Sequence, residues 1–533
     1  MVDVLVIGSG GAGLTAGLIA KAKGADVLIV SKNSLIASQT SMAQGGINSA
    51  LGSVTEDSVE LHISDTLNAS YGLGSLDMVE RMCRRAINAI EWLDRLGVPF
   101  NRTRDGKIAQ RFLGGALSKR ACYSQDYTGL KILHTLFDNV LKNGIPFLED
   151  RFLLNLIVED GRVKGATFLN IESGKVEQIL ARGVILATGG FGSLYRNYTT
   201  NAINVTGDGI ASVLRAGGTL SNMEFVQFHP TAMRHSLILI SEGARGEGGY
   251  LINSNGERFI DELLPRDIVA RAIFNEIKGG RDVFIDLRHL GERKLLELMP
   301  QEVMLCRVHE GIDPVREPIP IKPLAHYTMG GVDVDSSFRV DGLDGVYAVG
   351  ECSNAKVHGA NRLGGNSLLE IIAFGMEVGE IVTDNLMDIT PPLDNQLQKD
   401  RASIESIFNR EPKANFYQLE NNLGEKFYKY VGIIREEREL KLLRDKLEGI
   451  DIERFGIMDK QKEANTNLIE FLQFLNILEL GRVVVESALL REESRGSHFR
   501  ADFPKSSDKF LGEFHFFKSG EELKYKFIKK ENR

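Results

Sequence analysis

Residues 2–32, VDVLVIGSGGAGLTAGLIAKAKGADVLIVSK, are the stretch that decides the fold. Val2–Ile7 is apolar apart from Asp3, which is typical of a parallel strand that is buried on both faces. Gly8, Gly10 and Gly13 follow with the spacing G-x-G-x-x-G, and a helical pattern and a second apolar run come next. This βαβ unit predicts a site where a pyrophosphate meets the N-terminus of a helix.

The end of the second strand departs from the usual dinucleotide pattern. An acidic residue is expected there for the ribose hydroxyls, but Ser31 and Lys32 occupy the position. Lys32 could instead serve phosphate or adenosine contacts. Two later strand-like segments, GVILATGG at 183–190 and GVYAVGE at 345–351, end in Gly-Gly and Gly-Glu and would return the chain to the cofactor. Together these features favour FAD over NAD.

Composition sets the class of protein. The 533 residues suggest two to four domains, and 43% apolar and 26% charged residues are typical of a soluble globular chain. A net charge of −8 does not favour nucleic-acid binding. We find no apolar stretch of membrane-spanning length and no secretion signal, so we expect a cytoplasmic protein without its own membrane span.

The four cysteines, Cys83, Cys122, Cys306 and Cys352, are widely scattered, and no CxxC pair occurs. This spacing argues against a disulfide framework, a structural zinc, an iron–sulfur cluster or a c-type haem held by this chain. We therefore expect no metal site.

Six short motifs carry a specific resemblance. In chain order they are SQTSMAQGG (38–46), FHPT (228–231), SEGARGEGG (241–249), PRD (265–267), HYTMGG (326–331) and HGANRLGGNSL (358–368). In this order they resemble the flavoprotein subunits of the fumarate reductase/succinate dehydrogenase family, which also includes L-aspartate oxidase. The similarity runs almost to the end of the chain, at ESRGSH (493–498).

The resemblance implies a site for a C4 dicarboxylate, a substrate that needs cations or hydrogen-bond donors at both ends. It implies Arg266 as the donor of a proton to the substrate carbon, with Glu242 and Arg245 as the relay that replaces this proton. The remaining substrate-binding positions are His229 and Ser241 at one carboxylate and His326 and Arg362 at the other. The flavin would carry the hydride chemistry.

The resemblance also assigns the cofactor positions. They are Gly8, Gly10, Gly11, Gly13, Ser31, Lys32, Ser38, Thr40, Gln44, Gly45, Gly46, Ala187, Thr188, Gly189, Asp208, Glu351, Asn366, Ser367 and Leu368. Gln39 stands where many relatives have a histidine that links covalently to FAD. Glutamine cannot form that bond, so we expect non-covalent FAD, a lower flavin potential and a preference for fumarate reduction over succinate oxidation.

Two other functions stay open. L-aspartate oxidases carry an acid where this chain has Leu113, and an apolar residue cannot compensate a buried substrate ammonium. However, aspartate oxidases also lack the linking histidine, and residues 257–273 look more like theirs. A flavin-binding scaffold without turnover is the third possibility, and the complete set of expected catalytic residues argues against it.

The expected fold is α/β, an FAD-binding Rossmann-like parallel sheet domain with an inserted α+β capping domain and a C-terminal helical domain. The expected boundaries are 1–222 and 335–390 for the FAD-binding domain, 223–334 for the capping domain, 395–490 for the helical domain and 491–533 for a tail with a hairpin, with a linker at 391–394.

The family resemblance also implies partners. Electrons would come from an iron–sulfur protein subunit, with a membrane anchor subunit as a further expectation, in electron transport during anaerobic respiration. Through such partners the chain would lie at the cytoplasmic side of the inner membrane. The tail at 508–529 fits either a contact with the iron–sulfur subunit or a surface hairpin without a partner.

Overall fold

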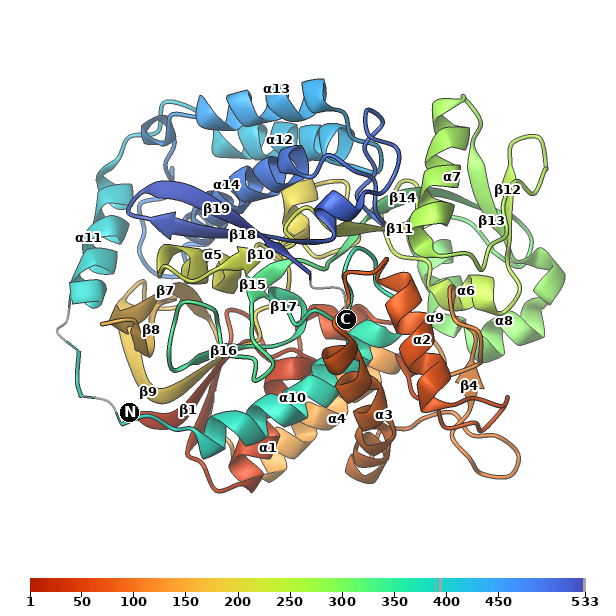
Figure 1. The fold of residues 1–533 in the computed structure, drawn as a ribbon, viewed down its shortest axis with the longest axis horizontal. Helices are drawn as coiled ribbons and strands as arrows, with labels where there is room; N and C mark the ends of the chain where they lie inside the picture. Colours follow the sequence, from red (N-terminus) through yellow and green to blue (C-terminus); the bar gives the residue numbers. More distant parts are fainter. Residues whose placement is uncertain (389, 393–394, 531–533) are drawn as a thin grey trace.

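The computed structural model describes residues 1–388, 390–392 and 395–530, and its largest sheet has seven strands (Figure 1). The strand order is β6-β2-β1-β9-β8-β7, and β16 also pairs with β9. Strands β6, β2, β1, β9 and β16 are parallel neighbours, whereas β7 and β8 are antiparallel. The strand bounds are β1 (Val2–Ile7), β2 (Val27–Val30), β6 (Phe147–Leu148), β7 (Arg151–Glu159), β8 (Arg162–Asn170), β9 (Val176–Leu186) and β16 (Val346–Ala348).

The centre of this sheet is buried because β1 lies between two parallel strands. Val4, Leu5 and Val6 have no exposed surface, as expected for an apolar run in a central strand. Helix α1 follows β1 directly and packs against α10 and α4, and these helices lie together below the sheet in Figure 1. The helices of this part are α1 (Gly11–Ala22), α2 (Val59–Ala69), α3 (Leu76–Leu96), α4 (Thr128–Lys142), α5 (Asp208–Arg215) and α10 (Asn366–Asp384). A small sheet, β3-β5-β4, joins β3 (Ile47–Asn48), β4 (Gln110–Arg111) and β5 (Ala121–Cys122).

A second unit, which we call the cap, comprises the elements between residues 226 and 328 and lies at one end of the molecule (Figure 1). Its antiparallel sheet has the order β11-β14-β13-β12. Its own core contains Met233, Leu251, Ile273 and Ile285, separate from the main core. The elements are β11 (Val226–Met233), α6 (Glu242–Gly246), β12 (Tyr250–Asn253), α7 (Arg266–Lys278), β13 (Val283–Asp286), α8 (Glu292–Leu298), α9 (Pro300–Leu305) and β14 (Ile319–Thr328). The α+β character agrees with the expected fold class, and the exact boundaries 223 and 334 stay a prediction.

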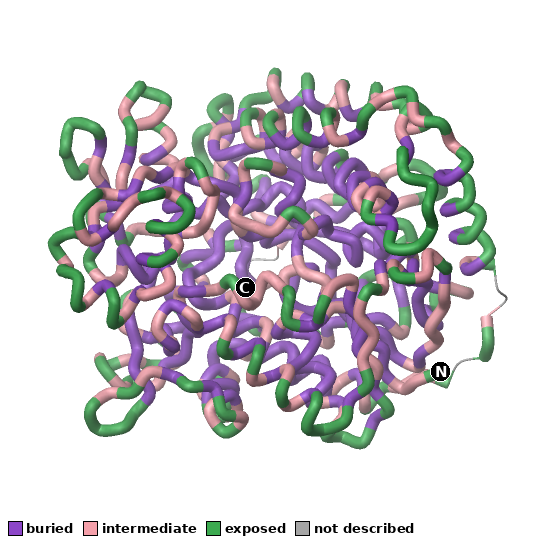
Figure 2. The backbone as a smooth tube through the Cα atoms, turned by 180° about the vertical axis from the view of Figure 1, so that it is seen from behind, coloured by how far each residue is buried: buried purple, intermediate pink, exposed green. Residues whose placement is uncertain are grey.

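The helical region contains α11 (Asn395–Asn409), α12 (Phe416–Tyr430), α13 (Glu437–Glu448) and α14 (Thr466–Leu490). Leu440, Leu443 and Leu447 share the buried face of α13, as their spacing predicts. On α14, Leu468 is buried, whereas Leu472 and Leu475, which share its helical face, are only half-buried. Helix α14 packs against α5, α12 and α13 at once, so it is buried on several sides rather than on one stripe. Figure 2 shows that buried backbone fills the middle of the molecule, whereas exposed backbone lies mostly at its edges.

The chain ends in a hairpin of β18 (Gly512–Ser519) and β19 (Glu522–Lys529). Strand β18 also pairs with β10 (Leu220–Ser221), which continues through β15 (Gly331–Asp333) to β17 (Ser353–Asn354). The hairpin therefore completes a five-stranded sheet with strands that precede it by more than 150 residues. Among the described residues, no helix is both long and apolar enough for a bilayer crossing.

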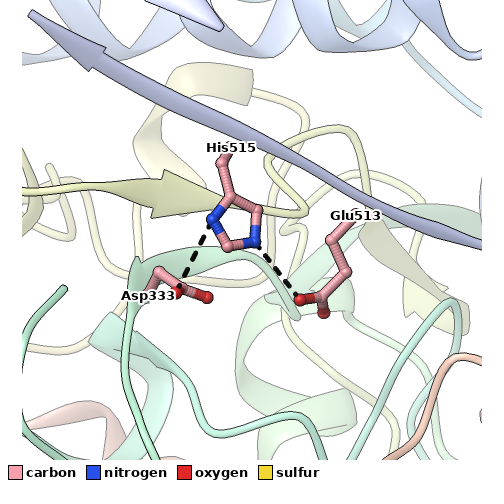
Figure 3. A group of neighbouring side chains, drawn as sticks. All are labelled: Asp333, Glu513 and His515. Carbon is pink, nitrogen blue, oxygen red and sulfur yellow. Dashed lines mark ion pairs between the residues drawn. The ribbon is translucent and has the colours of Figure 1, made fainter. Parts of the chain in front are cut away.

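A buried charged cluster holds this hairpin in place (Figure 3). His515 lies between two carboxylates, with Nδ1 3.7 Å from Asp333 Oδ2 and Nε2 3.5 Å from Glu513 Oε2. Lys356 Nζ lies 3.3 Å from Asp333 Oδ1. The three side chains are close enough for a shared metal ion, but the two ring nitrogens face different carboxylates and the lysine already supplies a positive charge. We interpret the group as an ion cluster that fixes β18 to β15.

Candidate active site

The glycine loop after β1 brings backbone close to the end of β9. Gly8 has φ +113°, and a Cβ there would lie 2.2 Å from the carbonyl oxygen of Ala187. A Cβ on Gly13 would lie 2.0 Å from the carbonyl oxygen of Gly8, so this glycine lets α1 approach the strand. Gly10 is the N-cap of α1 and offers no side-chain cap, although the N–H of Gly11 donates to Thr40 Oγ1 at 3.0 Å. The next N–H groups of the first turn of α1 are available to an anionic ligand.

This loop forms one wall of a cavity of about 660 Å³. The other walls come from the η1 turn (Gln39–Met42), from the end of β9, from α10 and from the cap. The predicted site residues that line it are Gly8, Gly10, Gly11, Ser31, Lys32, Ser38, Thr40, Gln44, Ala187, Thr188, Gly189, Asp208, His326, Glu351, Arg362, Ser367 and Leu368, together with Gln39. Seventeen positions scattered from residue 8 to residue 368 thus meet around one space.

The walls of the cavity fit FAD. The hydroxyl oxygens of Ser38 and Thr188 are buried and have no hydrogen-bond partner within the described part of the chain. A buried polar atom without a partner costs free energy, so we expect both hydroxyls to form hydrogen bonds with a bound ligand. The open end of α1 and the near absence of side chains along the glycine loop suit a pyrophosphate that must approach backbone N–H groups.

Four predicted cofactor positions lie behind the cavity wall. Gly13 serves helix packing, and Gly45 and Gly46 lie against Leu113 and the carbonyl of Cys122, respectively. The Asn366 side chain binds other residues rather than the cavity, because its amide Nδ2 donates to Thr66 and its Oδ1 is bonded to Asn48 and His62. These residues shape the wall from outside.

Lys32 is paired within the protein. Its Nζ lies 2.5 Å from Asp208 Oδ2 and also donates to the carbonyl oxygen of Asn204. The ammonium therefore fixes the start of α5 at the cavity. After β2, where an acidic residue is usual, this chain has a lysine instead, and the ion pair of Lys32 with Asp208 connects the end of β2 to α5.

Two histidines meet at the cap end of the cavity. The rings of His229 on β11 and His326 on β14 lie with centroids 5.0 Å apart in an edge-to-face arrangement. Burial lowers the pKa of both side chains well below the ordinary value, and the charge of Arg266 adds to this. Both are therefore neutral near pH 7 and can donate hydrogen bonds without charge. Nδ1 of His326 is 2.7 Å from Thr200 Oγ1, which leaves Nε2 for a ligand.

Arg362 is the unpaired cation of the site. It is 3% exposed and lines the cavity, and its guanidinium makes no hydrogen bond or ion pair within the described residues. Its guanidinium carbon lies 4.2 Å from the ring centroid of Tyr327. Burial, followed by repulsion from Arg266, lowers its pKa to about 10, so it stays charged near pH 7. A buried cation without a partner requires an anion.

A chain of ion pairs lies in the cap beside these residues. Arg266 Nη2 is 2.6 Å from Glu242 Oε2, and Arg245 Nη2 is 2.8 Å from Glu242 Oε1. Burial alone would raise the pKa of Glu242, but the two arginines outweigh it and the pKa is lowered. Glu242 begins α6, where Ser241 is the N-cap and its Oγ accepts from the Gly243 N–H. These residues are buried next to the cavity rather than in its wall.

Sequence reasoning missed Gln227, which connects the two groups. Its Oε1 accepts from Arg266 Nη1 at 2.9 Å, and its Nε2 donates to the carbonyl oxygen of Arg362 at 2.8 Å. A signal was present, because Gln227 lies directly before the FHPT motif, two residues from His229 on β11. Gly364 was also missed: a Cβ there would lie 2.0 Å from Glu242 Oε2.

Leu113 lies at the same end of the site. Its side chain is 2% exposed and neighbours Gly45 and Gly364. The surrounding charges are the guanidinium groups of Arg245, Arg266 and Arg362 against two carboxylates, Glu242 and Glu351, and burial raises the pKa of Glu351 to about 7. The site is therefore net positive, which suits a dianion and disfavours a ligand ammonium.

Family models match most of the chain. One, described as "FAD binding domain", matches residues 3–368, and another, described as "Fumarate reductase flavoprotein C-term", matches residues 420–532. The chain is 37% identical to the 8-methylmenaquinol:fumarate reductase flavoprotein subunit of Wolinella succinogenes, over 95% of this chain and 86% of that protein. It is 38% identical to the succinate dehydrogenase flavoprotein subunit of Rickettsia felis, over 95% and 91% of the two chains.

Solved structures show the same fold. A structure titled "Quinol-Fumarate Reductase with Menaquinol Molecules" superposes with a TM-score of 0.94 at 34% identity, over 100% of this chain and 98% of that one. Sdh1 of Mycobacterium smegmatis in complex with UQ1 superposes with a TM-score of 0.88 at 33% identity, over 100% and 94%.

Proposed function

The chain belongs to the family of fumarate reductase and succinate dehydrogenase flavoprotein subunits, and on that premise we propose that it is the catalytic subunit that interconverts fumarate and succinate. One observation supports a dicarboxylate as the substrate. Arg362 is a buried cation at the cavity that has no hydrogen-bond or ion-pair partner among the residues that the structure describes, and it lies next to two neutral histidines. A dicarboxylate supplies the missing negative charge.

The two ends of the substrate would meet different groups. Arg362 and His326 would bind one carboxylate, since both line the cavity. His229 and the Ser241 hydroxyl would bind the other. Arginine offers a planar two-point contact to a carboxylate, and the neutral imidazoles donate without adding charges that would have to be desolvated. The arrangement fixes the length of the acid between two anchor points.

Arg266 is proposed as the proton donor to the substrate carbon. An arginine is a weak acid, so it can serve only if its proton is replaced at once. Glu242 Oε2 lies 2.6 Å from Arg266 Nη2, and its other oxygen binds Arg245. This buried chain supports a relay in which a proton passes from Arg245 through Glu242 to Arg266. Gln227 would orient Arg266 by binding Nη1.

FAD would be held by the glycine loop, by Ser38, Thr40 and Gln44, and by the ends of β9 and α10. When bound, it supplies the hydride in fumarate reduction. Gln39 lines the cavity, and its Oε1 accepts from Asn201 Nδ2 at 3.3 Å. A glutamine amide cannot make the covalent link, so we propose non-covalent FAD. Acid precipitation should then release all flavin into the supernatant, and flavin retained in the pellet would contradict the proposal.

We further propose fumarate reduction as the favoured direction, because a flavin without a covalent link has a lower potential. Electrons would arrive from an iron–sulfur protein subunit, with a membrane anchor subunit completing an assembly at the cytoplasmic side of the inner membrane. Co-purification of the chain with an iron–sulfur protein from its native host tests the partner. Rates measured in both directions with artificial dyes test the preference.

The decisive test of substrate class uses the FAD-bound chain under anaerobic conditions. Fumarate should reoxidise the chemically reduced flavin and leave succinate as the product. The alternative function, L-aspartate oxidase, predicts that L-aspartate reduces the oxidised flavin and that peroxide forms in air. The apolar Leu113 beside the site argues for inertness to L-aspartate. Flavin reduction by L-aspartate would overturn the proposal.

A further inference from the structure

A buried pair of acids joins the cap to the flavin-binding part of the chain. Glu302 lies on α9 and Asp126 lies in the turn before α4, and they are 2% and 0% exposed. The backbone N–H of Glu302 donates to Asp126 Oδ2 at 2.8 Å. Within the described residues, the second oxygen of each carboxylate, Glu302 Oε2 and Asp126 Oδ1, is buried without a hydrogen-bond partner. None of the reaction steps derived above uses this pair.

The Glu302 carboxylate reaches the substrate site through backbone. Its Oε1 accepts a hydrogen bond from the N–H of Ser241. Ser241 caps α6, and its own Oγ accepts from the Gly243 N–H at 2.9 Å. The next residue, Glu242, is the bridge between Arg266 and Arg245. One side chain therefore fixes the turn that carries both a proposed substrate donor and the proposed proton relay.

A buried cation meets this turn from the flavin-binding part. Arg111 on β4 donates to the carbonyl oxygens of Gln44 and Gly45, both at 2.8 Å, and its Nη1 has no partner within the described residues. A Cβ on Gly243 would lie 3.2 Å from that Nη1. The α6 turn thus lies between Arg111 of the flavin-binding part and Glu302 of the cap, and the backbone N–H of Glu302 is bound by Asp126.

We propose that Glu302 is a positioning residue of the active site: held by Asp126 and bonded to the Ser241 N–H, it sets the α6 turn, and with it Ser241 and Glu242, against the flavin-binding part of the chain. The inference rests on the proposed function, since it assigns Glu302 its role through those two residues. Breaking the contact between Glu302 and the Ser241 N–H therefore misplaces the substrate donor and the proton relay together.

The contact that Glu302 makes with Asp126 and Ser241 responds to pH. Burial, followed by repulsion from Asp126, raises the pKa of Glu302 to about 8, against the opposing effects of the Ser241 hydrogen bond and Arg111. Burial also raises the pKa of Asp126. Other charged or titratable groups at this place are Cys306, next to Glu302, and Glu247 and Tyr123, next to Arg111. Above pH 8 the buried carboxylates of Glu302 and Asp126 are both ionised and repel each other. The contact between α9 and the turn before α4 therefore weakens as pH rises.

The test uses the full chain with FAD bound, reduced viologen as electron donor and fumarate as substrate, from about pH 6 to about pH 9.5. Glu302→Leu removes the acceptor of the Ser241 N–H, and KM for fumarate should rise by about tenfold or more, because a buried donor loses its partner. Glu302→Gln keeps an acceptor and cannot ionise. It should raise KM less than Glu302→Leu does, and it should abolish the rise of KM through pH 8 that the wild type shows.

Two further variants keep the test decisive. Asp126→Asn retains an acceptor for the Glu302 N–H and removes the second charge, so its KM should also stay flat through pH 8, even if Glu302→Leu does not fold. Glu297→Gln, an exposed acid on α8, is the matched control and should follow the wild-type profile. A wild-type pH profile in both Glu302→Gln and Asp126→Asn overturns the inference. A wild type that does not turn over fumarate at all instead refutes the proposed function.

Discussion

Arg266 and Glu242 form a buried ion pair in which two guanidinium nitrogens point at one carboxylate oxygen. Nη2 and Nε of Arg266 lie 2.6 and 3.2 Å from Glu242 Oε2, and the other oxygen, Oε1, accepts from Arg245 Nη2 at 2.8 Å. The carboxylate therefore has one oxygen for each arginine. This geometry lets Glu242 bind one arginine tightly while it stays connected to the next.

The first prediction concerns Arg266 itself. Arg266→Gln should lower kcat for fumarate reduction by about a hundredfold or more, because general acids contribute roughly 10²–10⁴ to rates. Bound FAD should be retained, since Arg266 does not line the cavity. Steady-state kinetics and the flavin-to-protein ratio check both points. Arg293→Gln, at an exposed position on α8, is the control, and full turnover in Arg266→Gln would remove the catalytic assignment.

The second prediction concerns the space beside Glu242. Gly364→Ala places a methyl group 2.0 Å from Glu242 Oε2, so the carboxylate must move away from Arg266. We expect kcat to fall by about tenfold or more, because a misplaced catalytic group loses most of its effect. Gly449→Ala, at an exposed glycine after α13, controls for the substitution. Kinetics of Gly364→Ala that match the wild type would show that the carboxylate is not held where we describe it.

The third prediction concerns acid sensitivity. Arg435 Nη1 donates to His498 Nδ1 at 2.7 Å, and His498 Nε2 therefore donates to the Arg491 carbonyl oxygen at 3.0 Å, so the ring is neutral. Burial and these arginines lower its pKa well below the ordinary 6.5. Below pH 6.5 the unfolded chain binds a proton that the folded chain excludes, so the free energy of unfolding falls as pH falls, by about 1.4 kcal/mol per pH unit for each such histidine.

His498→Asn should reduce the slope of the free energy of unfolding against pH between about pH 6.5 and pH 5. The reduction should correspond to the uptake of about one proton fewer on unfolding. Urea unfolding at several pH values, followed by circular dichroism, measures it. His134 is exposed on α4, and His134→Asn should leave the slope as it is in the wild type. An unchanged slope in His498→Asn would refute the neutral, buried state of this ring.

The fourth prediction concerns the C-terminal hairpin. His515→Ala leaves the Asp333 and Glu513 carboxylates without the ring between them, and we expect a loss of about 1–3 kcal/mol in stability because buried charges lose a partner. The thermal midpoint should fall while KM for fumarate stays close to the wild-type value. Lys526→Ala, at the exposed cross-strand neighbour of His515, is the control. A midpoint equal to that of the control would mean that the cluster does not hold the hairpin.

The sequence by itself determined the βαβ start, the α/β fold class with its cap and helical region, and the family, since the apolar run of β1, its glycines and the six motifs are encoded within a few residues each. Local backbone requirements and side-chain periodicity leave such signals in short windows. The buried face of α13 was predictable for the same reason. That of α14 was not, because three neighbouring helices cover it and no single stripe stands out.

Only the tertiary structure decided which distant residues meet. Gln227 joins Arg266 to the Arg362 loop, Glu302 joins Asp126 to Ser241, and the final hairpin pairs with Leu220–Ser221. None of these partners is near the other in sequence. Their interactions exist because folding removes water from both groups and places them at hydrogen-bond distance, and a linear pattern carries no record of that distance.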